Sequence, residues 1–372
     1  MHRLITFIAA ALIAIGAMAA PKTYDLVSPD GRLKVEIKTG NGICYTLQHD
    51  SDVLLEDSYL GLYLTDGTSF GENAKVAGTS RRSVSEIYKT VLYKKAEVED
   101  SFNELTLKFK NFHLIFRAYD DGMAYRFVSR MKKPFTVKDE LASFNFAEDW
   151  NMWAAYVCQH TETLESQYYN SFENQYSYTP VSEWNKDHMA FLPLMVDGPH
   201  GKKIVITEAD LMNYPGMYLY NGDGGSDIAA RFASYPDEVK QGGHNNLQME
   251  VQGRKPFIAE CGAAEVFPWR IIAVSENDLQ MADNDMVYRL ATPADPEADW
   301  SWVKPGKVAW DWWNAWNIRG VDFVSGINND TYKYYIDFAS ANGIEYVILD
   351  EGWSVNGAAD LFQVVPEIDL EM

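Results

Sequence analysis

The sequence has few cysteines and too few basic residues for several classes of protein. Its three cysteines, Cys44, Cys158 and Cys261, are widely spaced among 372 residues, which excludes a disulfide framework and a zinc-ligand spacing. Lysine and arginine number 32 against 53 aspartates and glutamates, giving a formal net charge of −21. Nucleic acids and anionic membranes attract basic patches, so this balance argues against both as partners.

Long apolar runs are also absent, apart from a short one at the N-terminus. Residues 4–15 are apolar, follow Arg3 and precede Ala17-Met18-Ala19, which has the small-x-small form of a cleavage site. This run is too short to span a bilayer comfortably. We therefore predict a secretory signal peptide over residues 1–19, with export across the inner membrane to the periplasm. The alternative is an uncleaved anchor. No membrane insertion is expected after cleavage.

Several catalytic signatures are missing as well. The sequence contains no Walker loop, no GxSxG elbow and no HExxH pair, and its seven histidines form no metal pattern. The Gly-rich residues 221–226 precede no clear strand-to-helix unit, so they are interpreted as a turn. These absences argue against a P-loop nucleotide-binding protein, a serine hydrolase of the GxSxG type and a zinc protease of the HExxH type.

Residues 24–290 are dominated by strand patterns. Residues 33–38 and 104–110 alternate apolar and polar side chains, and residues 112–119 follow after Asn111 alone, which predicts a hairpin. An Asp-Asp-Gly turn signal separates that strand from the next, at residues 123–128. The pattern predicts a large antiparallel β-sandwich over residues 20–291.

The pattern changes after a Pro- and acid-rich boundary at residues 292–299, within a predicted linker at 292–305. A short strand at 307–310 is followed by a helix from about Thr331, with Asp330 as its cap, and by an almost entirely apolar strand at 345–350. Such a strand is typical of a parallel sheet buried on both faces.

The expected fold class is therefore multidomain, β followed by α/β. A strand, a helix and a strand with short connections form one βαβ unit, the first of a (β/α)8 TIM barrel. A complete barrel needs roughly 250 residues, and residues 306–372 supply about a quarter of that. We expect an incomplete, truncated barrel.

Acidic and aromatic residues follow both predicted barrel strands. Trp310 and Asp311 end the first, and Asp350 and Glu351 end the second. The carboxyl ends of barrel strands carry the active site, where carboxylates bind sugar hydroxyls or transfer protons and tryptophans stack on sugar rings. The alternative is that the tryptophans only pack and the acids only cap. Because two strands share the pattern, we favour four substrate-binding candidates.

A second polar segment, residues 160–178, is dense in Glu, Tyr, Asn and Gln and has no clear period. A long polar loop of this kind can reach a ligand or a hard cation such as Ca²⁺, which prefers oxygen ligands. A plain solvated loop is the alternative.

Five stretches in this order make the chain resemble glycoside hydrolase family 97, the secreted α-glucosidases and α-galactosidases of Bacteroidetes. They run through nearly all of the predicted mature chain: residues 116–127 (FRAYDDGMAYRF), 206–218 (ITEADLMNYPGMY), 268–271 (PWRI), 309–314 (AWDWWN) and 346–353 (YVILDEGW).

The resemblance implies that the N-terminal sandwich is a β-super-sandwich. It also implies exo-acting hydrolysis of α-linked glucosides or galactosides, with an oligosaccharide substrate and a Ca²⁺ cofactor. Glu173, in residues 171–176 (SFENQY), best matches the calcium ligand of the N-terminal domain, and Glu165 is the second choice. Trp310 and Glu351 match sugar-contacting positions. The general acid and the base or nucleophile are implied on later barrel strands, so no catalytic residue is assigned and the 372-residue chain alone is expected to be inactive.

Two alternatives to an enzyme remain open at this point. One is a non-catalytic carbohydrate-binding β-sandwich protein, in which the sandwich folds alone. The other is an extracellular structural or adhesion sandwich without a sugar site. The tryptophan cluster from Trp310 to Trp316 argues against the second, because exposed tryptophans without a ligand are costly.

Overall fold

The computed structural model describes residues 21–90, 93–171, 173–293, 295, 297–358 and 363–369. The predicted signal peptide, residues 1–19, therefore lies outside the described residues. In the part of the chain that the structure describes, no helix is long and apolar enough to cross a membrane. The chain divides into two compact units. Unit 1 comprises Met1–Tyr235 and Lys255–Thr292, and unit 2 comprises Pro236–Arg254 and Pro293–Met372.

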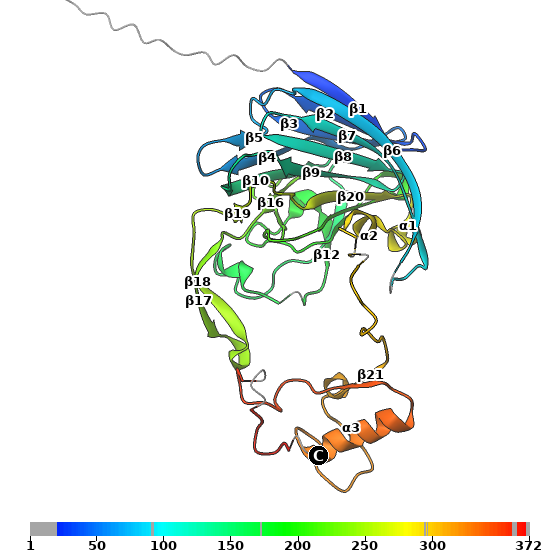
Figure 1. The fold of residues 1–372 in the computed structure, drawn as a ribbon, viewed down its shortest axis with the longest axis vertical. Helices are drawn as coiled ribbons and strands as arrows, with labels where there is room; N and C mark the ends of the chain where they lie inside the picture. The colour runs from blue at the N-terminus through cyan, green and yellow to red at the C-terminus, as the bar shows by residue number, and fades with distance from the viewer. Residues whose placement is uncertain are drawn as a thin grey trace, which may run out of the picture. The chain divides into compact units, whose positions relative to one another are not determined.

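Unit 1 is a sandwich of two nine-stranded sheets (Figure 1). The first sheet has the order β1 (Lys22–Val27), β2 (Leu33–Thr39), β3 (Ile43–His49), β4 (Asp52–Leu64), β10 (Phe135–Asn145), β16 (Asp227–Arg231) and β15 (Tyr218–Tyr220), with β5 (Ser69–Phe70) on β4 and β19 (Ala259–Cys261) on β10. The second has the order β12 (Ser177–Pro180), β11 (Asn151–Ala154), β13 (Leu194–Asp197), β14 (Lys203–Ala209), β20 (Trp269–Ser275), β9 (Gly122–Ser129), β8 (Phe112–Tyr119), β7 (Glu97–Lys108) and β6 (Gly78–Lys89).

The residues with alternating apolar and polar side chains form strands, as predicted. Every pair within these two sheets is antiparallel, and β7, β8 and β9 are consecutive neighbours, which confirms the hairpin predicted around Asn111. Alternate residues of β2 and of β8 are buried in one core shared by both sheets. The predicted sandwich is therefore observed, and its core lies between the sheets.

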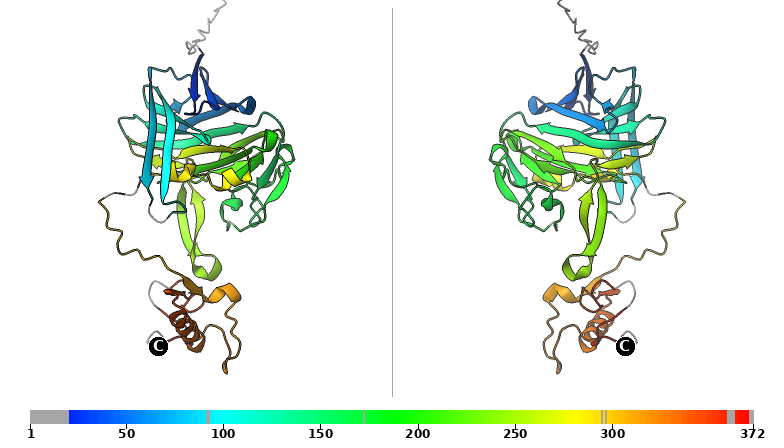
Figure 2. Two further views of the ribbon diagram at one scale, coloured as in Figure 1. Left: turned by 90° about the vertical axis from the view of Figure 1, so that its right-hand side faces the viewer. Right: turned by 90° about the vertical axis from the view of Figure 1, so that its left-hand side faces the viewer.

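Strand β20 is buried on both faces. Ile272 and Val274 point into the core between the sheets, whereas Trp269 and Ile271 join a second cluster on the opposite face. That face is covered by two short helices, α1 (Asp278–Ala282) and α2 (Met286–Leu290), which contact β20 (Figure 2). Because both faces are covered, all seven residues of β20 are buried.

An ion network crosses the interior of the sandwich. Arg270 of β20 donates two hydrogen bonds to Glu140 of β10, at 2.8 and 2.7 Å, and a further one to Glu208 of β14. Arg270 is 1% exposed. Glu208 in turn accepts the backbone N–H of Met217 at 3.1 Å. The network therefore ties both sheets to the loop of the 206–218 stretch.

Residues 206–218 also bind Thr292, the last residue of unit 1. Asp210 accepts from the backbone N–H and the hydroxyl of Thr292, both at 2.9 Å, and pairs with Arg126 at 3.2 Å. Arg126 also lies 4.3 Å from the ring centroid of Trp269. Three of the stretches that carry the family resemblance, residues 116–127, 206–218 and 268–271, are therefore in contact with one another inside unit 1.

Unit 2 contains a hairpin and a parallel strand-helix-strand unit. The hairpin joins β17 (Pro236–Gly242) and β18 (Gln248–Arg254), and the sequence pattern does not indicate that it groups with residues beyond 293. β21 (Val308–Trp310) and β22 (Tyr346–Ile348) are parallel and are joined through α3 (Asn329–Ala341) (Figure 1). The βαβ topology is thus observed; that it begins an incomplete (β/α)8 barrel stays a prediction.

Two details of unit 2 differ from expectation. The cap of α3 is Asn328, whose side chain accepts from the backbone N–H of Thr331 at 2.9 Å, while Asp330 lies in the first turn. The predicted cap was wrong because Asn and Asp two residues apart give the same signal. Tyr346 and Ile348 of β22 are 42% and 47% exposed, not buried on both faces, because α3 is the main element packed on this strand pair.

Candidate functional site

Two strand ends meet in unit 2. The parallel register pairs Val308 with Tyr346 and Trp310 with Ile348, so both strands finish at the same edge. The chain then continues into the 3₁₀ helix η5 (Asp311–Asn314) on one side and into residues 350–353 on the other. The structure thereby brings the four predicted substrate-binding residues together; their contact with sugar stays a prediction.

Asp311 links the two strand ends. Its carboxylate accepts the backbone N–H of Asp350 at 3.1 and 3.3 Å and the indole N–H of Trp316 at 3.1 Å. Asp311 is fully buried. A buried carboxylate needs such donors, since an unpaired one is strongly destabilising. In this structure the buried Asp311 therefore holds the backbone of Asp350 in place. The burial of Tyr332, and secondarily the charge of Asp311, raises the pKa of that phenol.

Trp316 is a member of this site that the sequence pattern did not single out. Ala315 and Trp316 both have left-handed backbone angles, with φ of 53° and 55°. The chain turns back there, so the backbone N–H of Trp316 donates to the carbonyl of Asp311 at 2.9 Å. A left-handed backbone costs non-glycine residues conformational energy, so it persists only where the surrounding contacts determine it. The dense run of tryptophans gave no signal that would distinguish Trp316 from its neighbours.

Trp310 and Asp350 form the exposed rim of the strand ends. The indole N–H of Trp310 donates to Asp350 Oδ2 at 2.8 Å, and Asp350 Oδ1 accepts the backbone N–H of Glu351 at 2.7 Å. Trp310 is 37% exposed, and its ring centroid lies 5.9 Å from that of Trp313. The rim thus presents aromatic faces beside fixed carboxylates, a combination that suits a sugar ring with its hydroxyls.

The Glu351 carboxylate has a partner outside the strand ends. Its Oε1 lies 2.8 Å from His244 Nε2, at the end of the β17–β18 hairpin. Hydrogen bonds from Asn245 and His244 lower the pKa of Glu351, so its carboxylate is the favoured form. Sequence reasoning missed His244, because a lone histidine in a Gly- and Asn-rich turn carries no pattern.

The polar segment 160–178 belongs to unit 1 and is anchored by Gln167. This buried amide donates to the carbonyl of Asp187 at 2.6 Å and accepts the backbone N–H of Met189 at 2.8 Å. Glu173 is exposed, and its carbonyl accepts from the thiol of Cys158 at 3.5 Å. Asn174 also donates to the carbonyl of Tyr156, so the segment is held at several points while the Glu173 side chain is exposed to solvent.

The fit of calcium to these residues is limited. Glu173 offers the carboxylate oxygen that Ca²⁺ prefers, but the ion takes six to eight oxygen ligands. Among the residues that the structure describes, no three His, Cys, Asp or Glu side chains are grouped so that they could hold a metal ion. The donor type fits and the donor set does not, so we derive no chemical step through calcium.

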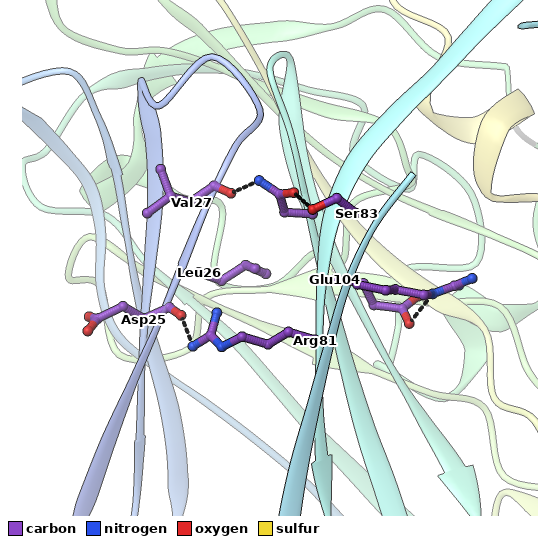
Figure 3. A pocket seen from close by; sticks show the side chains of 8 residues that line it. Asp25, Leu26, Val27, Arg81, Ser83 and Glu104 are labelled. Carbon is purple, nitrogen blue, oxygen red and sulfur yellow. Dashed lines mark hydrogen bonds and ion pairs between the residues drawn. The ribbon is translucent and has the colours of Figure 1, made fainter. Parts of the chain in front are cut away.

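A pocket of about 560 Å³ lies elsewhere in unit 1, between β1 and strands β6 and β7 (Figure 3). Arg81 donates across it to the carbonyl of Asp25, and Asn103 donates to the carbonyl of Val27 at 2.8 Å. Ser83 donates to Asn103 at 2.5 Å. These bonds join the edge of one sheet to the other, so we interpret the pocket as a structural gap of the sandwich.

Comparison with known proteins places both units in one family. The family model described as "Glycosyl-hydrolase 97 N-terminal" matches residues 26–293, and "Glycoside hydrolase 97" matches residues 312–372. A retaining α-galactosidase of Bacteroides thetaiotaomicron is 47% identical over 369 residues, 99% of this chain and 56% of that protein. A probable retaining α-galactosidase of Streptomyces bingchenggensis is 26% identical over 330 residues, 87% of this chain and 45% of that one.

Solved structures show the same fold. A family 97 enzyme of Pseudoalteromonas sp. strain K8, in complex with acarbose, matches with a TM-score of 0.73 and 21% identity, over 93% of this chain and 51% of that one. A β-arabinopyranosidase matches with a TM-score of 0.70 and 22% identity, over 91% and 52%. The chain thus spans about half the length of the relatives it matches. From the two family models and the sequence identity, the chain belongs to glycoside hydrolase family 97.

Proposed function

We propose that this chain is the sugar-recognising part of a retaining, exo-acting α-galactosidase. The 47% identity with a retaining α-galactosidase, over 99% of the chain, carries this proposal. It favours α-galactosides over α-glucosides, both of which the sequence pattern left open. The β21-α3-β22 unit would be the first part of a (β/α)8 barrel, which its parallel register and the family match over residues 312–372 support.

In this proposal the strand ends bind and orient the sugar. Asp350 and Glu351 accept hydrogen bonds from hydroxyls, Trp310 offers its ring face, and Asp311 holds the backbone of Asp350 in place. A retaining glycosidase further needs a carboxylate nucleophile and an acid/base carboxyl about 5–5.5 Å apart. We assign neither to this chain, and we propose that these 372 residues alone bind sugar without hydrolysing it.

Substrate preference tests the proposal. The complete gene product that contains this chain is assayed with 4-nitrophenyl α-galactoside and α-glucoside. We expect kcat/KM at least about 100-fold higher for the galactoside, because a site that hydrogen-bonds one hydroxyl orientation leaves buried polar groups unpaired with the other epimer. A preference for the glucoside would contradict the galactosidase assignment, and no cleavage of either would contradict the enzyme.

Calcium dependence is a further proposal, supported by the resemblance and by the exposed carboxylate of Glu173. In the complete gene product, Glu173→Gln should raise the Ca²⁺ concentration for half-maximal activity by at least about tenfold, since even the groups that support metal ligands are worth 10–100-fold. Glu165→Gln serves as the matched control. An unchanged Ca²⁺ titration in the Glu173 variant would exclude it as a ligand, and a change in the Glu165 variant alone would reassign the role.

Export to the periplasm stays part of the proposal and is supported by the sequence of residues 1–19. Amino-terminal sequencing of the protein recovered from a periplasmic extract should start near Ala20. Recovery with Met1 intact would contradict cleavage.

A further inference from the structure

The β17–β18 hairpin ends in a tip, residues 241–246, that contacts the loop after β22, residues 350–357. Both segments belong to unit 2. The hairpin is a two-stranded sheet of its own. Its side chains are largely exposed, with Val239 at 51% and Met249 at 60%. An isolated two-stranded hairpin is marginally stable in water, so contacts between its own two strands do not explain why this hairpin is stable.

The first contact joins His244 to Glu351. A carboxylate only accepts, so His244 Nε2, 2.8 Å from Glu351 Oε1, must carry the proton that is shared. Asn245 Nδ2 lies 3.2 Å from the same ring nitrogen, which then has no lone pair to accept it. This amide is therefore left to donate to Glu351, and its hydrogen bond is the largest influence that lowers the pKa of that carboxyl.

The second contact lies further along the loop, at Asn356 and Gly357. Asn356 donates to Asn245 Oδ1 at 3.3 Å. A Cβ at Gly357 would stand 2.9 Å from Gln241 Nε2 and 3.2 Å from the carbonyl oxygen of Asn246. The loop therefore lies close against the tip: a Cβ at this position would displace the end of the Gln241 side chain and press on the Asn246 carbonyl, and its φ of +74° also favours glycine.

The tip is itself a closed structure. Gln241 donates to the carbonyl of Asn246 at 2.9 Å, and Gly243, Asn245 and Asn246 all have left-handed φ, between 50° and 70°. The backbone N–H of Asn246 donates to the carbonyl of Gly243 at 3.2 Å, and that of Leu247 donates to the carbonyl of His244 at 3.1 Å, which closes the 3₁₀ turn η4 (His244–Asn246). The imidazole is thus presented from a preformed turn, and the turn meets the loop at both Glu351 and Gly357.

We propose that the hairpin tip is a wall of the sugar site and that His244 is a positioning residue for Glu351. The inference rests on the proposed function in that Glu351 binds a sugar hydroxyl. By holding Oε1, His244 fixes the plane of the carboxylate and leaves its remaining acceptor positions for one hydroxyl arrangement. The hairpin thereby contributes to selection between sugar epimers without touching the reacting bond.

Hydrogen exchange on the 372-residue chain tests the contact without any sugar. In His244→Ala, amides of residues 351–357 should exchange about tenfold faster, while those of α3 stay unchanged. Gly357→Ala should give the same result, because its Cβ presses on the tip and its φ of +74° strains an alanine. His200→Ala, at an 80% exposed histidine of unit 1, should have no effect. Unchanged exchange at 351–357 in both variants would overturn the inference whatever the enzyme does.

Kinetics of the complete gene product test the positioning role. His244→Ala should raise KM for the α-galactoside about tenfold with a smaller change in kcat, and His244→Gln, which keeps a donor, should restore most of the loss. A kcat loss without a KM change, or no rescue by glutamine, would overturn positioning even if exchange changes as expected. If the unaltered protein cleaves no glycoside, the proposed function fails, and the exchange result alone decides whether the tip holds the loop.

Discussion

Arg270→Met should lower the free energy of unfolding of unit 1 by about 3–5 kcal/mol. Arg270 is 1% exposed and is hydrogen-bonded to Glu140 and Glu208. Its loss leaves two carboxylates between the sheets without a cation, and breaking a buried pair from one side costs far more than the intact pair contributes. Urea unfolding of the 372-residue chain, followed by tryptophan fluorescence, measures the change.

The loss in the free energy of unfolding of Arg270→Met should grow as the pH rises. Burial raises the pKa of Glu208, and the charge of Arg270 and the hydrogen bonds from Met217 and Arg270 offset this only in part. A carboxyl with a raised folded-state pKa favours folding when protonated, and that contribution is lost as pH rises through the folded pKa. Without Arg270 the folded-state pKa of Glu208 rises further. The variant should therefore be least stable, relative to the unaltered chain, at pH 7–8, and the difference in free energy of unfolding should shrink toward pH 5.

Arg82→Met is the matched control. Arg82 bonds Glu104 in the same two-pronged way, at 2.7 and 2.8 Å, but its side chain is 55% exposed. Glu104 also keeps Arg117 at 2.9 Å. Because Arg82 is exposed and the buried Glu104 stays paired with Arg117, the Arg82 bond should contribute about 0–1 kcal/mol, so this variant should unfold almost like the parent. Equal losses in the two variants would contradict the assignment of Arg270 as the interior link between the sheets.

Asp311→Ala should lower kcat/KM of the complete gene product for an α-galactoside by at least about 100-fold. The variant loses the acceptor for the backbone N–H of Asp350 and for the indole of Trp316. Each hydrogen bond to a buried charged group contributes about 1.5–3 kcal/mol, so losing two of them releases the strand end that carries Glu351. Initial rates at varied substrate concentration measure the effect.

Two further variants define the origin of this loss. Asp311→Asn keeps one acceptor oxygen and should lose less activity than Asp311→Ala. Asp330→Ala removes an exposed acid in the first turn of α3 and should change kcat/KM by less than about twofold, since the helix is capped by Asn328. Full activity in Asp311→Ala would show that the two strand ends do not depend on this carboxylate.

The sequence predicted the fold more fully than the site, for physical reasons. Alternating runs such as residues 33–38 predicted strands because one face of each is buried, and the short connections between 307 and 350 predicted parallel pairing. The cluster at Trp310, Asp311, Asp350 and Glu351 followed from strand order alone. Their different roles did not, because no local pattern shows that Asp311 is buried.

Contacts between distant residues account for what was missed. His244 lies 107 residues from Glu351 in the chain. Trp316 donates its indole N–H to Asp311, but it stands among several tryptophans that look alike in the sequence. Arg270 looked like part of a short family stretch, yet its partners are 130 and 62 residues away. Such pairs are set by tertiary packing, which no period or motif of a single sequence encodes.

The stereochemistry of hydrolysis tests the central claim most directly. The complete gene product is mixed with an α-galactoside in an NMR tube, and the anomeric proton of the released galactose is followed from the first minute. We predict that α-galactose appears first and then mutarotates, as a double displacement requires. Early release of β-galactose, or of glucose from an α-glucoside only, would contradict a retaining α-galactosidase.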